Sequence, residues 1–339
     1  MNDKSLKLFR KLFFWANNAS KRNRTVQKLL YDDENKSCFS DVQLHEKMLS
    51  CSVRMSTYLK GIQRCIKPGD VVVDLGTGSG ILSFFAAKQN PKKIYAIDHS
   101  DFIKVSAEIG KKNKVKNISY LKTNSRDFSP DEKVDVILHE QMGWNVFSEN
   151  MIDNLLDLKR RVLKPSGVIL PAKFELFIEP VVLHGEHRIP FIWEQEINQI
   201  DFSFLRNSEL LNEFKTQFYT NMAIKGCFVD HFVCEPEVAL SFDLNNLNNE
   251  SEIPRNIHAT KTVIQEGTVD GLCVYFRAIF DPEISFDTSP LSKQTCWPNM
   301  LLRTERTPCK VGDIISVSLN MQNLVRHTTW QSTMVKSPA

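Results

Sequence analysis

The chain has 339 residues, of which 42% are hydrophobic, 24% charged and 10% aromatic. This composition excludes a disordered or fibrous chain, and the length indicates more than one hydrophobic core. The net charge is +3, but residues 1–30 hold eight basic residues and one acidic residue, so residues 31–339 carry a net −4. No apolar run reaches the roughly 20 residues of a membrane-spanning helix, so we expect no transmembrane segment.

The first 30 residues are expected to form a basic helical segment. Apolar residues from Leu8 to Phe13 recur at helical spacing beside lysines and arginines, which predicts an amphipathic helix over residues 4–15. Such a helix could pack on its own domain, or bind a membrane surface or an acidic partner. The segment lacks a long apolar core followed by small residues, so it does not resemble a secretory signal.

The cysteines and histidines carry no strong metal motif. None of the eight cysteines forms a C-x-x-C pair, so their spacing predicts neither a zinc site nor a redox dithiol. A chain of this length does not need disulfides, and we expect reduced thiols in a cytoplasmic protein, or a nuclear one in a eukaryote. His184-x-x-His187 could suggest a metal site, but two histidines beside Gly185 in a loop are more often solvated, and we expect no metal.

Between residues 70 and 171 the pattern alternates between apolar strands and amphipathic helices. We expect strands at 71–75, 94–97, 118–121, 134–138 and 168–170, and helices at 81–89, 101–113 and 149–163. Strands that are apolar throughout and separated by helices predict a parallel sheet that is covered on both faces.

After Pro171 the pattern changes to strands without regular helices between them. We expect strands at 174–183, 225–242, 257–265, 271–281 and 312–321, which predicts a mostly antiparallel β domain. The stretch 190–220 interrupts these strands and is predicted to be partly helical. Trp330 is predicted to be a packing anchor in a polar tail.

A glycine-rich turn follows the first strand of the parallel sheet. It reads Asp74-Leu-Gly76-Thr-Gly78-Ser-Gly80, and Asp98 ends the second strand. Glycines let a ligand approach the backbone, the helix N-terminus favours negative charge, and a carboxylate at this place can bind both hydroxyls of a ribose. A nicotinamide dinucleotide and S-adenosylmethionine both fit this reasoning. The form D-x-G-x-G-x-G resembles motif I of class I S-adenosylmethionine-dependent methyltransferases.

A loop after the fourth strand carries two carboxylates, Glu140 and Glu149. Functional residues in open α/β sheets gather beyond the strand C-termini, and two carboxylates on one loop can bind a planar cation through paired hydrogen bonds. We expect Glu149 in the first turn of the following helix, where the helix dipole favours an ionised acid. The alternative is a helix N-terminal acid beside an unrelated one. His139, just before Glu140, could contact a ligand or be an ordinary polar loop residue.

Several separated segments resemble the protein arginine methyltransferase family. The segment from Glu140 to Met151 resembles its double-glutamate loop, H-E-K-M-L with V-R and Tyr58 resembles its entry helix, and two later segments resemble its domain boundary and its T-H-W stretch. The resemblance implies a Rossmann-like domain at 31–171, then a β-barrel domain at 172–339 with a dimerisation arm near 190–220. It also implies a homodimer and no direct nucleic-acid binding.

The resemblance implies a site for S-adenosylmethionine, which would leave as S-adenosylhomocysteine. The implied catalytic residues are Glu140 and Glu149. The implied cofactor-binding residues are Met48, Arg54, Asp74, Gly76, Gly78, Gly80, Asp98, Ser125 and Glu140. The implied substrate-binding residues are Glu140, Met142, Glu149, Met151 and Trp297. Met48 and Met151 would lie near the transferred methyl group, and Trp297 could instead fill the interdomain core.

The chain departs from the family pattern around the substrate. The T-H-W histidine is Cys296, and its usual aspartate partner aligns with Ser37. Two tyrosines of the same motif align with Asn35 and Phe39, and Arg126 replaces an acid near the adenine. The leading prediction is methylation of arginine in a protein or peptide. The alternatives are methylation of free arginine or another small guanidino metabolite, and a catalytically weak scaffold.

Overall fold

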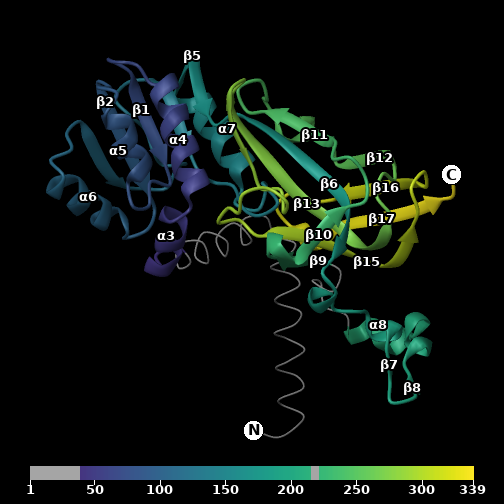
Figure 1. The fold of residues 1–339 in the computed structure, drawn as a ribbon. Helices are drawn as coiled ribbons and strands as arrows, with labels where there is room; N and C mark the ends of the chain where they lie inside the picture. Colours follow the sequence, from purple (N-terminus) through teal and green to yellow (C-terminus); the bar gives the residue numbers. More distant parts are fainter. Residues whose placement is uncertain (1–38, 215–220) are drawn as a thin grey trace, which may run out of the picture.

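The computed structural model describes residues 39–214 and 221–339. The predicted N-terminal helix at 4–15, and with it Asn35 and Ser37, therefore lies outside the described residues. Figure 1 shows two β-rich bodies side by side and a small excursion that stands away from both. Within the described residues, no helix is both long enough and apolar enough to cross a bilayer.

The first body is built on a five-stranded parallel sheet with strand order β3-β2-β1-β4-β5. Its strands are β1 (Val71–Leu75), β2 (Lys93–Asp98), β3 (Ile118–Lys122), β4 (Val134–His139) and β5 (Leu163–Leu170). The central strands β1 and β4 are almost completely buried because helices cover both faces of the sheet. The predicted parallel sheet is confirmed.

The helices of this body follow the predicted order. They are α3 (Val42–Leu49), α4 (Ser52–Cys65), α5 (Ile81–Ala87), α6 (Ile103–Lys112) and α7 (Met151–Val162). Helix α7 begins two residues later than predicted, because Asn150 has a left-handed backbone with φ of 52°. Glu149 therefore precedes the helix and is not in its first turn. The last strand also begins earlier than predicted, at Leu163, directly after α7.

The second body is antiparallel, as predicted. One sheet runs β10-β6-β13-β15-β9, with β11 paired to β6 and β14 paired to β13, and a second sheet runs β12-β16-β17. The strands are β6 (Lys173–Leu183), β9 (Asn221–Ile224), β10 (Val229–Phe232), β11 (Val238–Asp243), β12 (Asn256–Thr262), β13 (Gly267–Asp281), β14 (Ile284–Asp287), β15 (Asn299–Cys309), β16 (Ile314–Met321) and β17 (Trp330–Ser337). The predicted single strand 225–242 is wrong, since β10 and β11 pair separately with β6.

The excursion occupies the stretch that was predicted to be partly helical. It contains η1 (Gly185–His187), η2 (Ile192–Glu194), the hairpin β7 (Glu196–Ile197) and β8 (Ile200–Asp201), η3 (Ser203–Asn207) and α8 (Glu209–Phe214). Short 3₁₀ turns η4 (Gly226–Phe228), η5 (Glu250–Glu252) and η6 (His327–Thr329) connect strands of the second body. Figure 1 shows the hairpin and α8 at the far end of this excursion.

One hydrophobic core joins the two bodies. It extends from Tyr58 on α4 through the parallel sheet and α7 to Phe174, Leu319 and Trp330 in the second body. Trp330 is buried, so it is a packing anchor, but it begins strand β17 and does not lie in a tail. The shared core fixes the loops between the bodies, where the site lies.

Candidate active site

The glycine-rich turn adopts a backbone that requires glycine. Gly76, Gly78 and Gly80 have φ of 72°, 50° and 84°. A Cβ atom on Gly80 would lie 2.1 Å from Ser106 Oγ, and one on Gly78 would lie 2.8 Å from His45 Cε1. Left-handed backbone and close neighbours together explain the glycines at these positions. The turn thus exposes its backbone to the pocket above β1.

Asp74 holds the turn from beneath. Its Oδ2 accepts hydrogen bonds from Thr77 Oγ1 at 2.7 Å, from Ser83 N at 3.0 Å and from Ser83 Oγ at 2.6 Å. Burial raises the pKa of this carboxyl group, although these hydrogen bonds oppose the rise. Asp74 therefore ties the turn to the start of α5.

Asp98 lies at the carboxyl end of β2, facing the turn. Its Oδ2 accepts from Gly78 N at 2.9 Å and its Oδ1 accepts from Ser100 N at 2.8 Å. Each carboxylate oxygen can accept a further hydrogen bond. The two backbone contacts fix the carboxylate orientation and leave acceptor capacity for a pair of hydroxyl groups.

A pocket of about 720 Å³ that opens to solvent lies between the turn, helix α3 and the glutamate loop. The lining residues are Phe39, His45, Met48, Leu49, Arg54, Gly76, Thr77, Gly78, Ser79, Ile81, Leu82, Asp98, His99, Glu140, Gln141 and Glu149. The fold therefore brings both loop glutamates, Asp98 and the glycine turn to one cavity.

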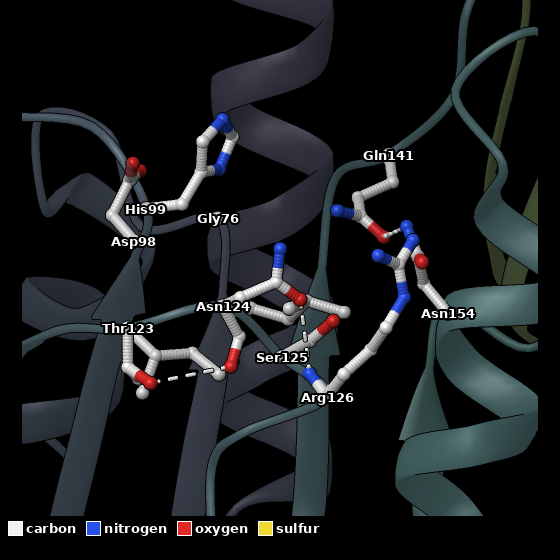
Figure 2. A pocket seen from close by; sticks show the side chains of 11 residues that line it. Gly76, Asp98, His99, Thr123, Asn124, Ser125, Arg126, Gln141 and Asn154 are labelled. Carbon is white, nitrogen blue, oxygen red and sulfur yellow. Dashed lines mark hydrogen bonds between the residues drawn. The ribbon is translucent and has the colours of Figure 1, made fainter. Parts of the chain in front are cut away.

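A polar cavity adjoins this pocket at the ends of β2 and β3. It shares Asp98, His99 and Gln141 with the first pocket. Ser125 and Arg126 lie on its other wall, and Figure 2 shows the Arg126 side chain extending toward Gln141 and Asn154. This wall is shaped by a hydrogen bond from the Arg126 backbone N–H to the Asn124 side-chain oxygen Oδ1, at 3.1 Å.

Arg54 and Glu140 form a buried ion pair at the opposite end. Arg54 Nη2 lies 2.6 Å from Glu140 Oε2, and their side chains are 7% and 13% exposed. Arg54 Nε and Nη1 are buried and find no hydrogen-bond partner among the described residues. Unpaired buried guanidinium donors are costly, so they fit a carboxylate that enters with a ligand, such as the amino-acid end of S-adenosylmethionine.

The two loop glutamates are poorly solvated. Burial raises the pKa of Glu140 to about 7, while Arg54 opposes the rise. Burial and the nearby charge of Glu140 raise the pKa of Glu149 to about 8. Two neighbouring carboxyl groups with raised pKa values are easier to ionise when a cation lies beside them, so the site favours an incoming cation.

The loop that carries the glutamates is held by both bodies. Tyr58 OH donates to His139 O at 2.9 Å, and Trp297 Nε1 donates to Met142 O at 2.6 Å. The His139 ring is buried and hydrogen-bonded to Pro171 O at 2.7 Å, so it supports the chain between β5 and β6 and does not face the pocket. The second body therefore sets the position of the loop through Trp297.

Some residues singled out in the sequence lie away from the cavities. Asp74, Gly80, Met142, Met151 and Trp297 line neither cavity. Met142 and Met151 are fully buried beneath the loop, and Trp297 stacks on Phe286 with ring centroids 5.2 Å apart. These residues therefore pack around the site without lining its cavities.

The histidine pair is arranged for ring stacking and a polar contact. The His187 ring stacks on Phe228, and His184 Nδ1 lies 3.6 Å from Asp230 Oδ1. Across residues 39–214 and 221–339, no group of three or more potential metal ligands was found.

The sequence prediction missed several pocket residues, among them His45, His99, Gln141, Thr123 and Asn124. His99, Thr123 and Gln141 each follow the end of a parallel strand, which is a signal that was available. His45 lies within the H-E-K-M-L motif, and its place over Gly78 depends on how α3 packs.

A parallel sheet with this glycine turn, Asp98 and the adjoining pocket defines an α/β protein that binds a nucleoside cofactor at the carboxyl ends of its strands, and class I S-adenosylmethionine-dependent methyltransferases are one such class. In agreement, the family described as "Ribosomal protein L11 methyltransferase (PrmA)" matches residues 55–171. The second body and the double-glutamate loop narrow the class further.

Full-length relatives identify the family. Protein arginine N-methyltransferase 6 of Xenopus tropicalis is 30% identical over 295 residues, which cover 83% of this chain and 83% of that protein. The Danio rerio protein of the same name is 29% identical over 300 residues, covering 85% and 82%. The solved Trypanosoma brucei PRMT1 enzyme–prozyme heterotetrameric complex with AdoHcy matches with a TM-score of 0.72 and 25% identity, covering 83% of this chain and 88% of that one. The chain belongs to the protein arginine N-methyltransferase family and is an S-adenosylmethionine-dependent methyltransferase.

Proposed function

We propose that this enzyme methylates the guanidinium group of arginine in a protein or peptide. The observation that carries the proposal is the placement of Glu140 and Glu149 on one pocket, opposite the turn and Asp98. S-adenosylmethionine supplies an electrophilic methyl group when bound. Met48, the turn glycines, Asp98 and Ser125 would hold this cofactor, and the free donors of Arg54 would bind its carboxylate.

The two glutamates would position and activate the guanidinium. An arginine side chain is protonated and delocalised at neutral pH, so it is a poor nucleophile. Paired hydrogen bonds to Glu140 and Glu149 would draw its positive charge toward two of the nitrogens and leave the third aligned for attack. An incoming cation also favours the ionised form of both acids. One of these two glutamates would accept the released proton.

Assembly and organisation form a second part of the proposal. We infer a Rossmann-like domain at 31–171, a β-barrel domain at 172–339 and a homodimer that forms through the excursion. The excursion exposes large apolar side chains, including Ile197, Ile200 and Phe204, and Phe204 is 71% exposed. Light scattering should give a dimer for the native protein and a monomer for Phe204→Asp.

A cytoplasmic location fits the free cysteines of the described residues.

A transfer assay with labelled S-adenosylmethionine tests the reaction. Arginine-rich peptide, the same peptide with lysines in place of arginines, free arginine and cell lysate are offered in parallel. Label on the arginine peptide, and none on its lysine control, is the expected result. Transfer only to free arginine would replace the protein substrate by a metabolite, and cofactor binding without any transfer would indicate a scaffold.

A further inference from the structure

Two cysteines that are 245 residues apart meet beside the ion pair of the pocket. Cys51 is the N-cap residue of α4, and Cys296 lies in the segment between β14 and β15. Cys296 N donates to Cys51 Sγ at 3.3 Å, so the Cys51 thiol lies against the backbone of Cys296. Both are free cysteines. The fold thus creates a thiol pair where the sequence spacing predicted none.

The surroundings give the two thiols different chemistry. The pKa of Cys51 is lowered to about 5 by the hydrogen bond from Cys296, by backbone N–H groups and by the charge of Arg54, against the effect of burial. Its place at a helix N-terminus acts in the same direction. The pKa of Cys296 is raised, first by this hydrogen bond and then by burial. The two shifts have opposite directions, so the surroundings favour the thiolate form at Cys51 and the protonated form at Cys296.

The other cysteines of the described chain lack this combination. Burial raises the pKa of Cys65, on the same helix α4, to about 11, and that of Cys234 to about 11. Cys273 and Cys309 are also shifted upward by burial. Because thiolate is the reactive form, an oxidant should select Cys51 over these four cysteines, and Cys227, which is exposed on η4, is the remaining competitor.

We propose that Cys51 and Cys296 form a redox-active dithiol, which hydrogen peroxide converts into a disulfide that ties helix α4 to the second body and stops methyl transfer. The Cys51 sulfur attacks one peroxide oxygen, the O–O bond breaks, and a water molecule leaves with a sulfenic acid left on Cys51. The Cys296 sulfur then attacks the Cys51 sulfur and releases a second water. Two thiols and one peroxide give one disulfide and two waters, and a dithiol reductant reverses the change.

The disulfide would distort both walls of the pocket. A covalent S–S bond is about 2.05 Å long, much shorter than the contact between hydrogen-bonded thiols. Cys51 lies between the lining residues Leu49 and Arg54, while Cys296 precedes Trp297, which holds the glutamate loop. Contraction at this point moves Arg54 relative to that loop, and a displacement near 1 Å can lower turnover by about 10²-fold.

The test uses the purified full chain, reduced and then treated with graded hydrogen peroxide. Mass spectrometry of a non-reducing digest should find one crosslinked peptide pair that contains Cys51 and Cys296. Methyl transfer should fall at least about tenfold in step with the crosslink and return with dithiothreitol. The crosslink is detected by mass spectrometry without any methyl acceptor, so this result does not depend on whether the proposed reaction is correct.

Two variants make the result decisive. In Cys296→Ser the crosslink should be absent, and peroxide should drive Cys51 to sulfinic acid, which dithiothreitol does not reverse. The control Cys65→Ser, on the same helix, should keep both the crosslink and the reversible inhibition. A disulfide to another cysteine, no disulfide when Cys51 is oxidised, or full activity in the crosslinked protein would each overturn the proposal.

Discussion

The two ends of the pocket are built on opposite principles. At the glycine turn, the residues with left-handed backbone are glycines, which adopt this conformation without strain. Asp98 and Asp74 are fixed by hydrogen bonds from the turn itself. At the other end, Glu140 and Glu149 are half-buried with raised pKa values, and Arg54 has buried donors without partners among the described residues. The first end is complete before a ligand arrives, whereas the second depends on what binds to it.

This difference separates binding from chemistry. A preformed turn costs little reorganisation when the cofactor enters, which favours affinity. Poorly solvated carboxylates interact more strongly with a cation than solvated ones, which favours activation of the guanidinium. Changes at the first end should therefore alter affinity and folding, and a change at Glu149 should alter turnover.

Glu149→Gln should have the largest effect. The amide keeps the size of the side chain but removes a charge and a proton acceptor, so we expect kcat to fall about 10³-fold. Cofactor affinity, measured by titration calorimetry, should stay near that of the native enzyme because Glu149 is not needed to hold the turn. The exposed Glu108→Gln on α6 is the control and should behave like the native protein. A parallel loss of cofactor affinity in Glu149→Gln would contradict the division between the two ends.

Gly80→Ala tests the preformed end. A Cβ there would lie 2.1 Å from Ser106 Oγ, in addition to the strain of a φ of 84°. We expect a loss of roughly 2–4 kcal/mol in the free energy of unfolding, and at least tenfold weaker cofactor binding. Gly69→Ala is the matched control, since its φ of 92° carries the same strain but no atom lies within 4 Å. Urea unfolding should show a smaller loss for Gly69→Ala, and equal losses would mean that packing around the turn is unimportant.

The pH dependence sharpens the comparison at the chemical end. The free enzyme should bind a cationic peptide best when both glutamates are ionised, so kcat/KM should rise with pH through about 7 and 8. Below pH 6, a plot of log(kcat/KM) against pH should have a slope that approaches 2 in the native enzyme, because two protons must be lost. The slope should approach 1 in Glu149→Gln. A flat profile between pH 6 and 8.5 would show that neither acid retains its proton in the free enzyme.

Stability should follow the opposite trend over the same range. The folded state keeps protons on Glu140 and Glu149 up to about pH 7 and 8, whereas the unfolded chain releases them near its ordinary glutamate pKa of about 4.3. The folded state therefore binds more protons in this window, so the contribution of these two groups to the free energy of unfolding falls as pH rises. Thermal unfolding of the native protein and Glu149→Gln should converge at low pH and separate at high pH.

The fold was predictable where side-chain patterns are local. The central parallel strands β1 and β4 are mostly apolar and buried, and the turn and the two glutamates lie in short continuous motifs. Strand β15 was missed because its second half, around Glu305, is polar, and its place is fixed by pairing with β13 and β9. Strand β17 was taken for a polar tail for the same reason, since only its pairing with β16 defines it.

Contacts between distant segments were beyond the sequence patterns. The meeting of Cys51 with Cys296, and of Trp297 with Met142, depends on how the two bodies pack through their shared core. No periodicity or spacing within either segment encodes such a contact. The roles of Glu140 and Glu149 remain predictions, although their common pocket supports them.

Trp297→Phe should give the smallest effect on kcat. This variant tests whether the second body positions the glutamate loop. Phenylalanine can keep the stacking on Phe286 but loses the indole N–H that donates to Met142 O at 2.6 Å, which should cost about 1 kcal/mol of stability. Trp330→Phe is the matched control, since its indole N–H donates to Asn323 O at 2.8 Å, in the turn before β17. Both variants should lose similar stability in urea, but only Trp297→Phe should lower kcat, by a few-fold. Equal kcat values would mean that Trp297 merely fills the core, and that the chemical end of the pocket is positioned by the first body alone.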